Sequence, residues 1–164
     1  MKIIENSGDG QDNAGVKIIT NDGERQETAP PVAKSYLYFW NLSVTLPAAS
    51  TTYYHSAFEF STSDSRNKIY VPTAITVTDV SIAIFSGTAS SAEAVTTYLR
   101  VAGVDNLINN TLIWNTAGGY NNVLCSGLNI AIAAGSYFNI KIVTPAWTTA
   151  PTNCRFFYTI AFKN

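Results

Sequence analysis

The sequence predicts an all-β protein, a jelly-roll-like two-sheet sandwich preceded by an extended N-terminal arm. From Ser35 onward, apolar and polar side chains alternate with a period of two, which marks strands that bury one face. Glycines separate these segments at turn or bulge positions. No segment carries a sustained apolar stripe of helical period with caps, so we expect at most one short helical turn, over residues 89–94.

A series of strand-like segments follows Ser35. In the clearest of them, Val80, Ile82 and Ile84 share one face of a single strand. Short strands at this spacing predict a sandwich or a barrel, and aromatic residues at many alternating positions favour a jelly roll. An immunoglobulin-like sandwich is the second alternative, although its Cys–Trp–Cys spacing is missing. The strand-like ranges are 36–45, 53–60, 79–86, 95–101, 107–115, 123–132, 136–144 and 154–163.

The composition changes near Pro30 and Pro31, which divides the chain into an attachment arm, 1–34, and a β-sandwich domain, 35–164. The arm is rich in charge and glycine and has no aromatic residue, a composition that does not fold alone. It holds two similar β-prone pieces, each followed by turn residues. We expect the arm to dock on a partner by adding strands to a sheet edge. The predicted docking residues are Ile3, Ile4, Val16, Ile18 and Ile19.

Composition and charge exclude several classes of partner. The net charge of −1 creates no field that would attract nucleic acid or an anionic membrane. The apolar runs are too short for a transmembrane helix, so no membrane insertion is expected. The residues after Met1 lead straight into polar sequence, and we expect no secretory signal peptide. Cys125 and Cys154 allow one disulfide at most. The first interpretation of each is a small buried apolar residue on a strand.

The residues that could carry catalysis are sparse. His55 is the one histidine, so a His-dependent triad or a multi-histidine metal site cannot form within one chain; a surface or half-buried structural role is the prediction. The glycine-rich segment 9–13 lacks the full EF-hand ligand series and is interpreted as a turn. We therefore predict no enzyme, no cofactor and no metal. The acidic residues Glu59, Asp64, Asp79, Glu93 and Asp105 show no spacing that pairs two carboxylates for glycoside hydrolysis.

Sugar binding is the stronger alternative, because pyranose rings stack on aromatic side chains ringed by amides and hydroxyls. The candidate glycan contacts in predicted loops are Tyr120, Asn121, Asn122 and Trp147. Trp147 also has a structural interpretation, since nearby prolines would let its ring lock the loop. Trp40 and Trp114 are interpreted as core or subunit-interface residues.

The second half of the chain resembles a known group of proteins. The resemblance covers about residue 66 to the C-terminus and is carried by turns and strand starts. Its residues are Lys68-Ile69-Tyr70-Val71-Pro72, Tyr98-Leu99-Arg100-Val101, Ser126-Gly127-Leu128-Asn129-Ile130, Ala134-Gly135-Ser136-Tyr137-Phe138-Asn139-Ile140-Lys141 and the segment 144–153. This series resembles the β-sandwich domains of tailed-phage virion appendage proteins, such as tail fibres and head fibres.

The resemblance implies a virion component that forms a homotrimer and is displayed on the particle exterior after synthesis in the host cytoplasm. It transfers no catalytic residue. Fibre proteins of that group have a long shaft before the tip, whereas here a short arm precedes the domain, an arrangement that suits a decoration protein equally well. We therefore expect a non-enzymatic phage structural protein, docked to other virion proteins through its arm. A carbohydrate-binding module for host envelope glycans is the alternative.

Overall fold

The computed structural model describes residues 17–19, 25–27, 35–40, 47–56, 60–114 and 118–164. The chain divides into two compact units, Met1–Ala33 and Lys34–Asn164. In the first unit, β1 (Lys17–Ile19) and β2 (Arg25–Glu27) form an antiparallel pair, with Ile18 opposite Gln26.

The described part of the second unit is built from strands and one 3-10 turn, η1 (Asp64–Arg66). Within the described residues, no helix is long and apolar enough to span a bilayer. The strands are β3 (Ser35–Trp40), β4 (Thr52–His55), β5 (Phe60–Ser61), β6 (Ile69–Tyr70), β7 (Ile75–Ser86), β8 (Ala94–Val101), β9 (Val104–Ile113), β10 (Gly119–Ile132), β11 (Tyr137–Val143) and β12 (Arg155–Lys163).

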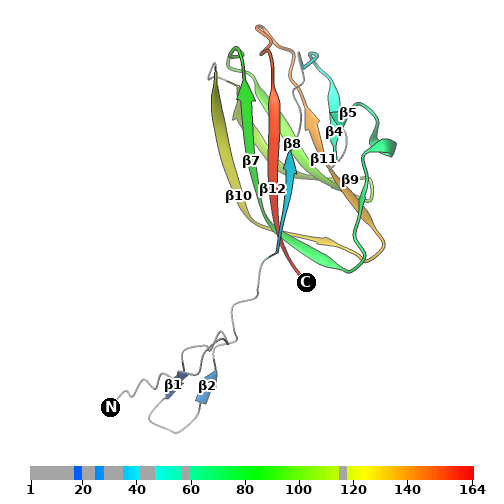
Figure 1. Cartoon of the computed structure of the whole chain (residues 1–164), viewed down its shortest axis with the longest axis vertical. Coiled ribbons are helices and arrows are strands. Elements are labelled where there is room, and N and C mark those ends of the chain that lie inside the picture. The colour runs from blue at the N-terminus through cyan, green and yellow to red at the C-terminus, as the bar shows by residue number, and fades with distance from the viewer. Residues whose placement is uncertain (1–16, 20–24, 28–34, 41–46, 57–59, 115–117) are drawn as a thin grey trace. The chain divides into compact units, whose positions relative to one another are not determined.

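These strands form two antiparallel sheets in jelly-roll order. One sheet has the order β10-β7-β12-β3 and the other the order β5-β4-β11-β8-β9, with β6 added beside β11. Figure 1 shows the two sheets facing each other, with the chain passing repeatedly from one to the other. Leaving out the two-residue strands β5 and β6, the first long strand pairs with the last and the second with the last but one, which is the double Greek key of a jelly roll. The predicted all-β, jelly-roll-like sandwich is confirmed.

The core lies between the two sheets and follows from the alternation of each strand. Along β7, Val80, Ile82 and Ile84 are fully buried, whereas their neighbours are partly exposed. Phe156 and Tyr158 on β12 bury the same inner face. Each such side chain contributes about 1.5–3 kcal/mol when removed from water. Trp114, which follows β9, is fully buried against Phe156, as its interpretation as a core residue predicts.

Positive φ angles mark the sharp turn between β8 and β9. Val101 is paired with Val104, so the connecting loop has only two residues. Ala102 has a φ of 48° and Gly103 a φ of 88°. A type I′ hairpin requires positive φ at both central residues, and its twist matches the twist of the strands.

The structure differs from the prediction at residues 89–94 and at His55. Residues 89–94 form no helical turn; instead the backbone N–H of Ser90 bonds to the carbonyl of Trp114, which holds this segment against the end of β9. His55 is not at the surface but 2% exposed, because it shares the inner face of β4 with Tyr53.

Candidate interaction surface

The outer face of the β10-β7-β12 sheet carries aromatic side chains in register. Tyr120 on β10 is opposite Phe85 on β7, which is opposite Arg155 on β12. The Tyr120 ring lies 5.2 Å from the ring of Phe85 and 5.8 Å from that of Phe157, centroid to centroid. The Arg155 guanidinium lies 5.5 Å from the Phe85 centroid, in position for a cation–π contact. Phe85, Tyr120, Leu124, Arg155 and Phe157 are called the outer aromatic face below.

Two large apolar residues of this face are exposed. Tyr120 is 55% exposed and Leu124 is 67% exposed. Both point outward because β10 alternates, and Val123 and Cys125, on either side of Leu124, turn toward the core. A cluster of this kind on a soluble domain marks a binding surface more often than a single exposed apolar residue does.

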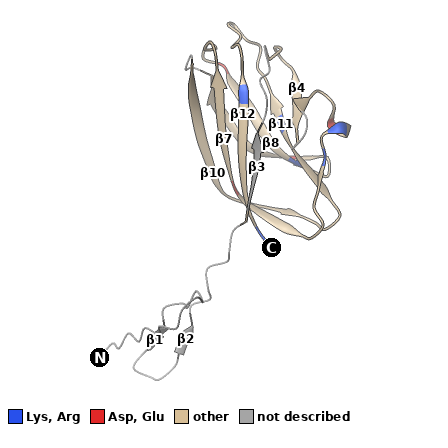
Figure 2. Cartoon of the chain, in the orientation of Figure 1, with Lys and Arg blue, Asp and Glu red and all other residues tan. Residues whose placement is uncertain are grey.

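Charge is almost absent from the same sheet. Gly119–Ile132 contains no charged residue, β7 contains only Asp79, and β12 has Arg155 and Lys163 at its two ends. Figure 2 shows the ribbons of β7, β10 and β12 almost free of Lys, Arg, Asp and Glu. Depletion of charge with enrichment of aromatic residues is the compositional signature of interface cores.

The six-stranded sheet has a different outer surface, with a network of ion pairs. Arg100 donates to Asp64 at 3.3 Å and to Asp105 at 2.5 Å, and Lys141 donates to Asp105 at 2.5 Å. Burial raises the pKa of Asp105, but hydrogen bonds from Lys141 and Arg100 outweigh it and hold that pKa below its usual value. This network was not predicted from the sequence, because its members come from η1, β8, β9 and β11. Asn139 on β11 completes it by donating to Asp64 at 2.7 Å.

Three of the four predicted glycan contacts, Tyr120, Asn121 and Asn122, lie on β10 and not in a loop, whereas Trp147 lies in the connection between β11 and β12. Tyr120 and Asn122 are exposed on the outer side of β10. Asn121 is half-buried and donates its side-chain amide to the carbonyl of Ile113 at 2.9 Å. Asn121 and Asn122 border a groove of about 270 Å³ between β9 and β10, together with Thr111, Leu112, Ile113 and Val123. Trp147 is not among the residues that line this groove.

Trp147 is held in place by contacts with other residues of the domain. Its half-buried ring lies 5.7 Å from that of Trp114, and its indole N–H donates to the carbonyl of Pro47 at 3.2 Å. The next residue, Thr148, donates its backbone N–H to the carboxylate of Glu93 at 3.0 Å. The Ser91 hydroxyl also donates to this carboxylate, and these bonds lower the pKa of Glu93 to about 2. The surroundings of Trp147 are those expected of a loop-locking residue.

Three of the five predicted docking residues lie outside the part of the chain that the structure describes. Ile3, Ile4 and Val16 are outside the described residues. Ile18 and Ile19 belong to β1, where Ile19 is opposite Arg25 of β2. Their docking role stays a prediction.

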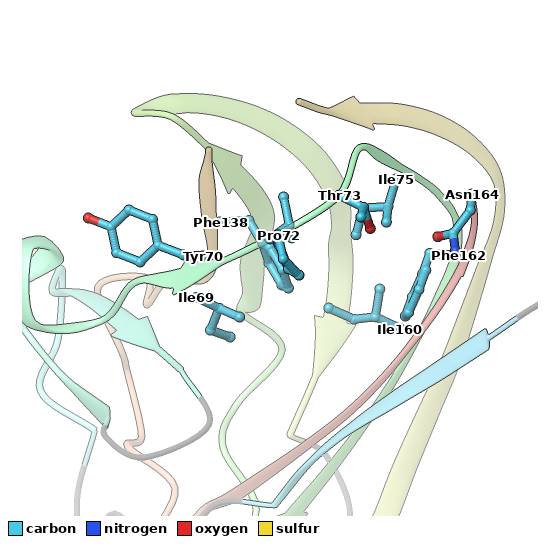
Figure 3. Close-up of a pocket in the computed structure, with 10 residues that line it drawn as sticks. Ile69, Tyr70, Pro72, Thr73, Ile75, Phe138, Ile160, Phe162 and Asn164 are labelled. Carbon is cyan, nitrogen blue, oxygen red and sulfur yellow. The ribbon is translucent and has the colours of Figure 1, made fainter. Parts of the chain in front are cut away.

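An apolar cavity that was not predicted from the sequence lies at one end of the sandwich. Its volume is about 280 Å³. Figure 3 shows its lining, which comes from the β6–β7 connection, the start of β11 and the end of β12, with Phe138, Ile160 and Phe162 among the residues drawn. Side chains this far apart in the sequence meet only through the sheet order, so no local pattern could have indicated the cavity.

Groups suited to catalysis are not gathered in the described part of the chain. No cluster of three or more His, Cys, Asp or Glu residues that could hold a metal ion occurs there. His55 is enclosed in the core beside Phe60 and Tyr158, and burial lowers its pKa to about 4. Cys125 and Cys154 are both free thiols, and burial raises the pKa of Cys154 to about 12.

No protein-family model matches the chain, and no curated protein matches it. Among solved structures, the chain is similar to a structure of the Gx strain of infectious bursal disease virus, with a TM-score of 0.43 and 14% identity over 94% of this chain. It is also similar to the VP2 subviral particle of infectious bursal disease virus, with a TM-score of 0.42 and 10% identity over 96% of this chain. The chain spans 36% and 41% of the lengths of those two proteins.

Proposed function

We propose that this protein is a non-enzymatic structural component of a phage particle, a β-sandwich that an N-terminal arm docks to other virion proteins. The outer aromatic face is the observation that carries the proposal. A sheet that leaves Tyr120 and Leu124 exposed and almost lacks charge is suited to contact with other protein surfaces. The jelly roll is an architecture found in viral capsid and lectin domains, a supporting analogy at the level of the fold.

The resemblance of the second half of the chain to phage appendage domains supports the finer assignment. On this proposal the domain decorates the particle exterior or forms a fibre that contacts the host surface. The copies associate through apolar faces, and the trimer implied by the resemblance is the first oligomer to test. Symmetric association would cover the same face on every copy.

Removal of residues 1–33 tests the role of the arm. The truncated domain should keep the wild-type β-type circular dichroism spectrum, because the core residues that the structure describes lie within Lys34–Asn164. It should no longer appear on intact particles when these are labelled with an antibody against the domain. Labelling equal to that of full-length protein would contradict arm docking.

Recognition of host glycans is the second candidate, and the polar groove beside Asn121 and Asn122 favours it. A glycan array with full-length protein separates it from a purely structural role. If the groove binds sugar, Asn122→Ala should abolish a specific signal, while Trp147→Ala should lower the unfolding temperature and keep the signal, because Trp147 packs on Trp114. An array without any specific signal would contradict glycan recognition and leave the structural role as the one remaining candidate.

A further inference from the structure

β10 is an edge strand whose free side lacks the usual protection against pairing. Its fourteen residues pair with β7 on one side, and no described strand pairs with its other side. Edge strands are normally protected by lysine, proline, a bulge or short length. β10 contains neither a charged residue nor proline, and its register shift is confined to the stretch between Ser126 and Ile130. Residues 119–126 therefore present a long, regular and uncharged edge.

The edges of the six-stranded sheet differ from β10. β5, at one edge, has only two residues. β9, at the other edge, carries Asp105, whose carboxylate is bound by Arg100 and Lys141. Short length and charge are the devices that discourage edge pairing, so both of these edges are protected and β10 is not.

A shallow groove borders β10 at the centre of the proposed pairing. The groove of about 270 Å³ follows the strand at Asn121, Asn122 and Val123. β9, on its far side, belongs to the other sheet and is not hydrogen-bonded to β10 as a neighbouring strand.

The exposed side chains of β10 are arranged symmetrically. Tyr120 and Leu124 are its two large exposed apolar residues, and each is two positions from Asn122. In an antiparallel pair of identical strands related by a two-fold axis at Asn122, Tyr120 of each copy is opposite Leu124 of the other. Apolar pairs directly opposite each other stabilise antiparallel sheets. No like charges meet, because the strand carries none.

We propose that β10 pairs with β10 of a second copy of this chain, antiparallel and centred on Asn122. The contact joins the four-stranded sheets of two copies into one continuous sheet and covers both free edges. This inference rests on the assembly role proposed above and names a surface for it. Because the contact is isologous, it joins copies in pairs, and in an assembly of trimers it would link one trimer to another.

Cysteine cross-linking tests the register in the full-length chain carrying Cys125→Ser. In that background, Asn122→Cys should give a covalent dimer under mild oxidation with oxidised glutathione, because opposed residues of an antiparallel pair have Cα atoms about 4.5–5.5 Å apart, within disulfide range. Ser126→Cys is the matched control on the same face of the strand. Its two copies would lie about 27 Å apart in this register, so no dimer should form. Equal cross-linking at both positions, or at neither, overturns the proposed pairing.

Sedimentation velocity of full-length variants tests the contact without cross-linking. Leu124→Lys should weaken self-association about tenfold, because it removes two apolar cross-strand pairs and places lysine on the edge. Leu107→Lys, at an exposed position on β9, should have no effect. Thermal unfolding shows whether both variants fold. Self-association that survives Leu124→Lys assigns assembly to another surface and overturns the β10 contact while the proposed function stands, whereas a wild-type chain that never associates contradicts both.

Discussion

His55 is a titratable side chain enclosed in an aromatic part of the core. Its ring lies 5.6 Å from that of Tyr158 and 6.0 Å from that of Phe60. Burial lowers its pKa from 6.5 to about 4, because the charged imidazolium would lose its hydration there. In the unfolded chain the same group titrates near its ordinary value. Between these two pH values the unfolded state therefore binds more protons than the folded state.

The domain should lose stability as the pH falls from 6.5 toward 4. The contribution of His55 is fully present above pH 6.5 and decreases until its folded pKa of about 4 is reached. A shift of this size corresponds to about 3 kcal/mol at the low end of the range. Urea unfolding at a series of pH values measures it.

His55→Leu is the matched variant, because leucine is of similar size and does not titrate. Its free energy of unfolding should change less between pH 6.5 and 4 than that of wild type, whatever its absolute value. Parallel curves for the two proteins would show that His55 does not carry the effect.

Residue-level prediction succeeded where a side chain follows the alternation of a long strand and failed where neighbours decide its surroundings. The buried face of β7, with Val80, Ile82 and Ile84, follows the predicted alternation. Tyr120 and Asn122 are exposed as predicted, but they lie on β10 and not in a loop. Tyr53 and His55 are two residues apart and so share one face of β4, but the prediction for His55 was a surface or half-buried position. The partners of Trp147, namely Trp114 and Pro47, are distant in the sequence and could not be predicted.

At the scale of single elements, β10 is interrupted by a bulge that depends on left-handed backbone. Three residues of β10 lie between Ser126 and Ile130, opposite the single residue Thr78 of β7. Within this bulge Gly127 has a φ of 70° and Asn129 a φ of 51°. Glycine adopts such angles without steric cost, and asparagine tolerates them better than other residues with a side chain.

Gly127→Ala should destabilise the domain by about 1–2 kcal/mol, the cost of a left-handed residue with a Cβ atom. A Cβ at this position would meet nothing within 4 Å, so the loss comes from the backbone and not from a clash. Urea unfolding measures the change, with Ser126→Ala as the neighbouring control at an exposed position. An unchanged midpoint for Gly127→Ala would contradict the assigned backbone strain.

Element prediction worked best for strands with an uninterrupted alternation, such as β11 and β12. β10 was predicted four residues too short at its start, because Gly119, Asn121 and Asn122 have low strand propensity and are held by pairing with β7. β5 and β6 have two residues each, too few for an alternation to show.

At the scale of the whole molecule, the sequence predicts two sheets but not which strands pair. The paired strands β3 and β12 come from opposite ends of the domain's sequence, and the paired strands β4 and β11 are nearly as far apart along the chain. Local alternation contains no information about such pairs. The outer aromatic face depends on this order, because Tyr120, Phe85 and Phe157 come from three strands that only the sheet brings together.

Composition did indicate the character of the surface. Only 13% of the residues are charged while 12% are aromatic. A soluble domain ordinarily has about a quarter of its residues charged. Because there is little charge to repel a second copy and an apolar face to attract one, the protein is expected to associate rather than remain alone in solution.

The mass of the full-length protein in solution tests this central claim most directly. Sedimentation equilibrium across a concentration series should show a species heavier than the 17.7 kDa chain, with its fraction rising with concentration. A single species of 17.7 kDa at every concentration, including the highest that stays soluble, would contradict an assembly protein built around an uncovered apolar sheet.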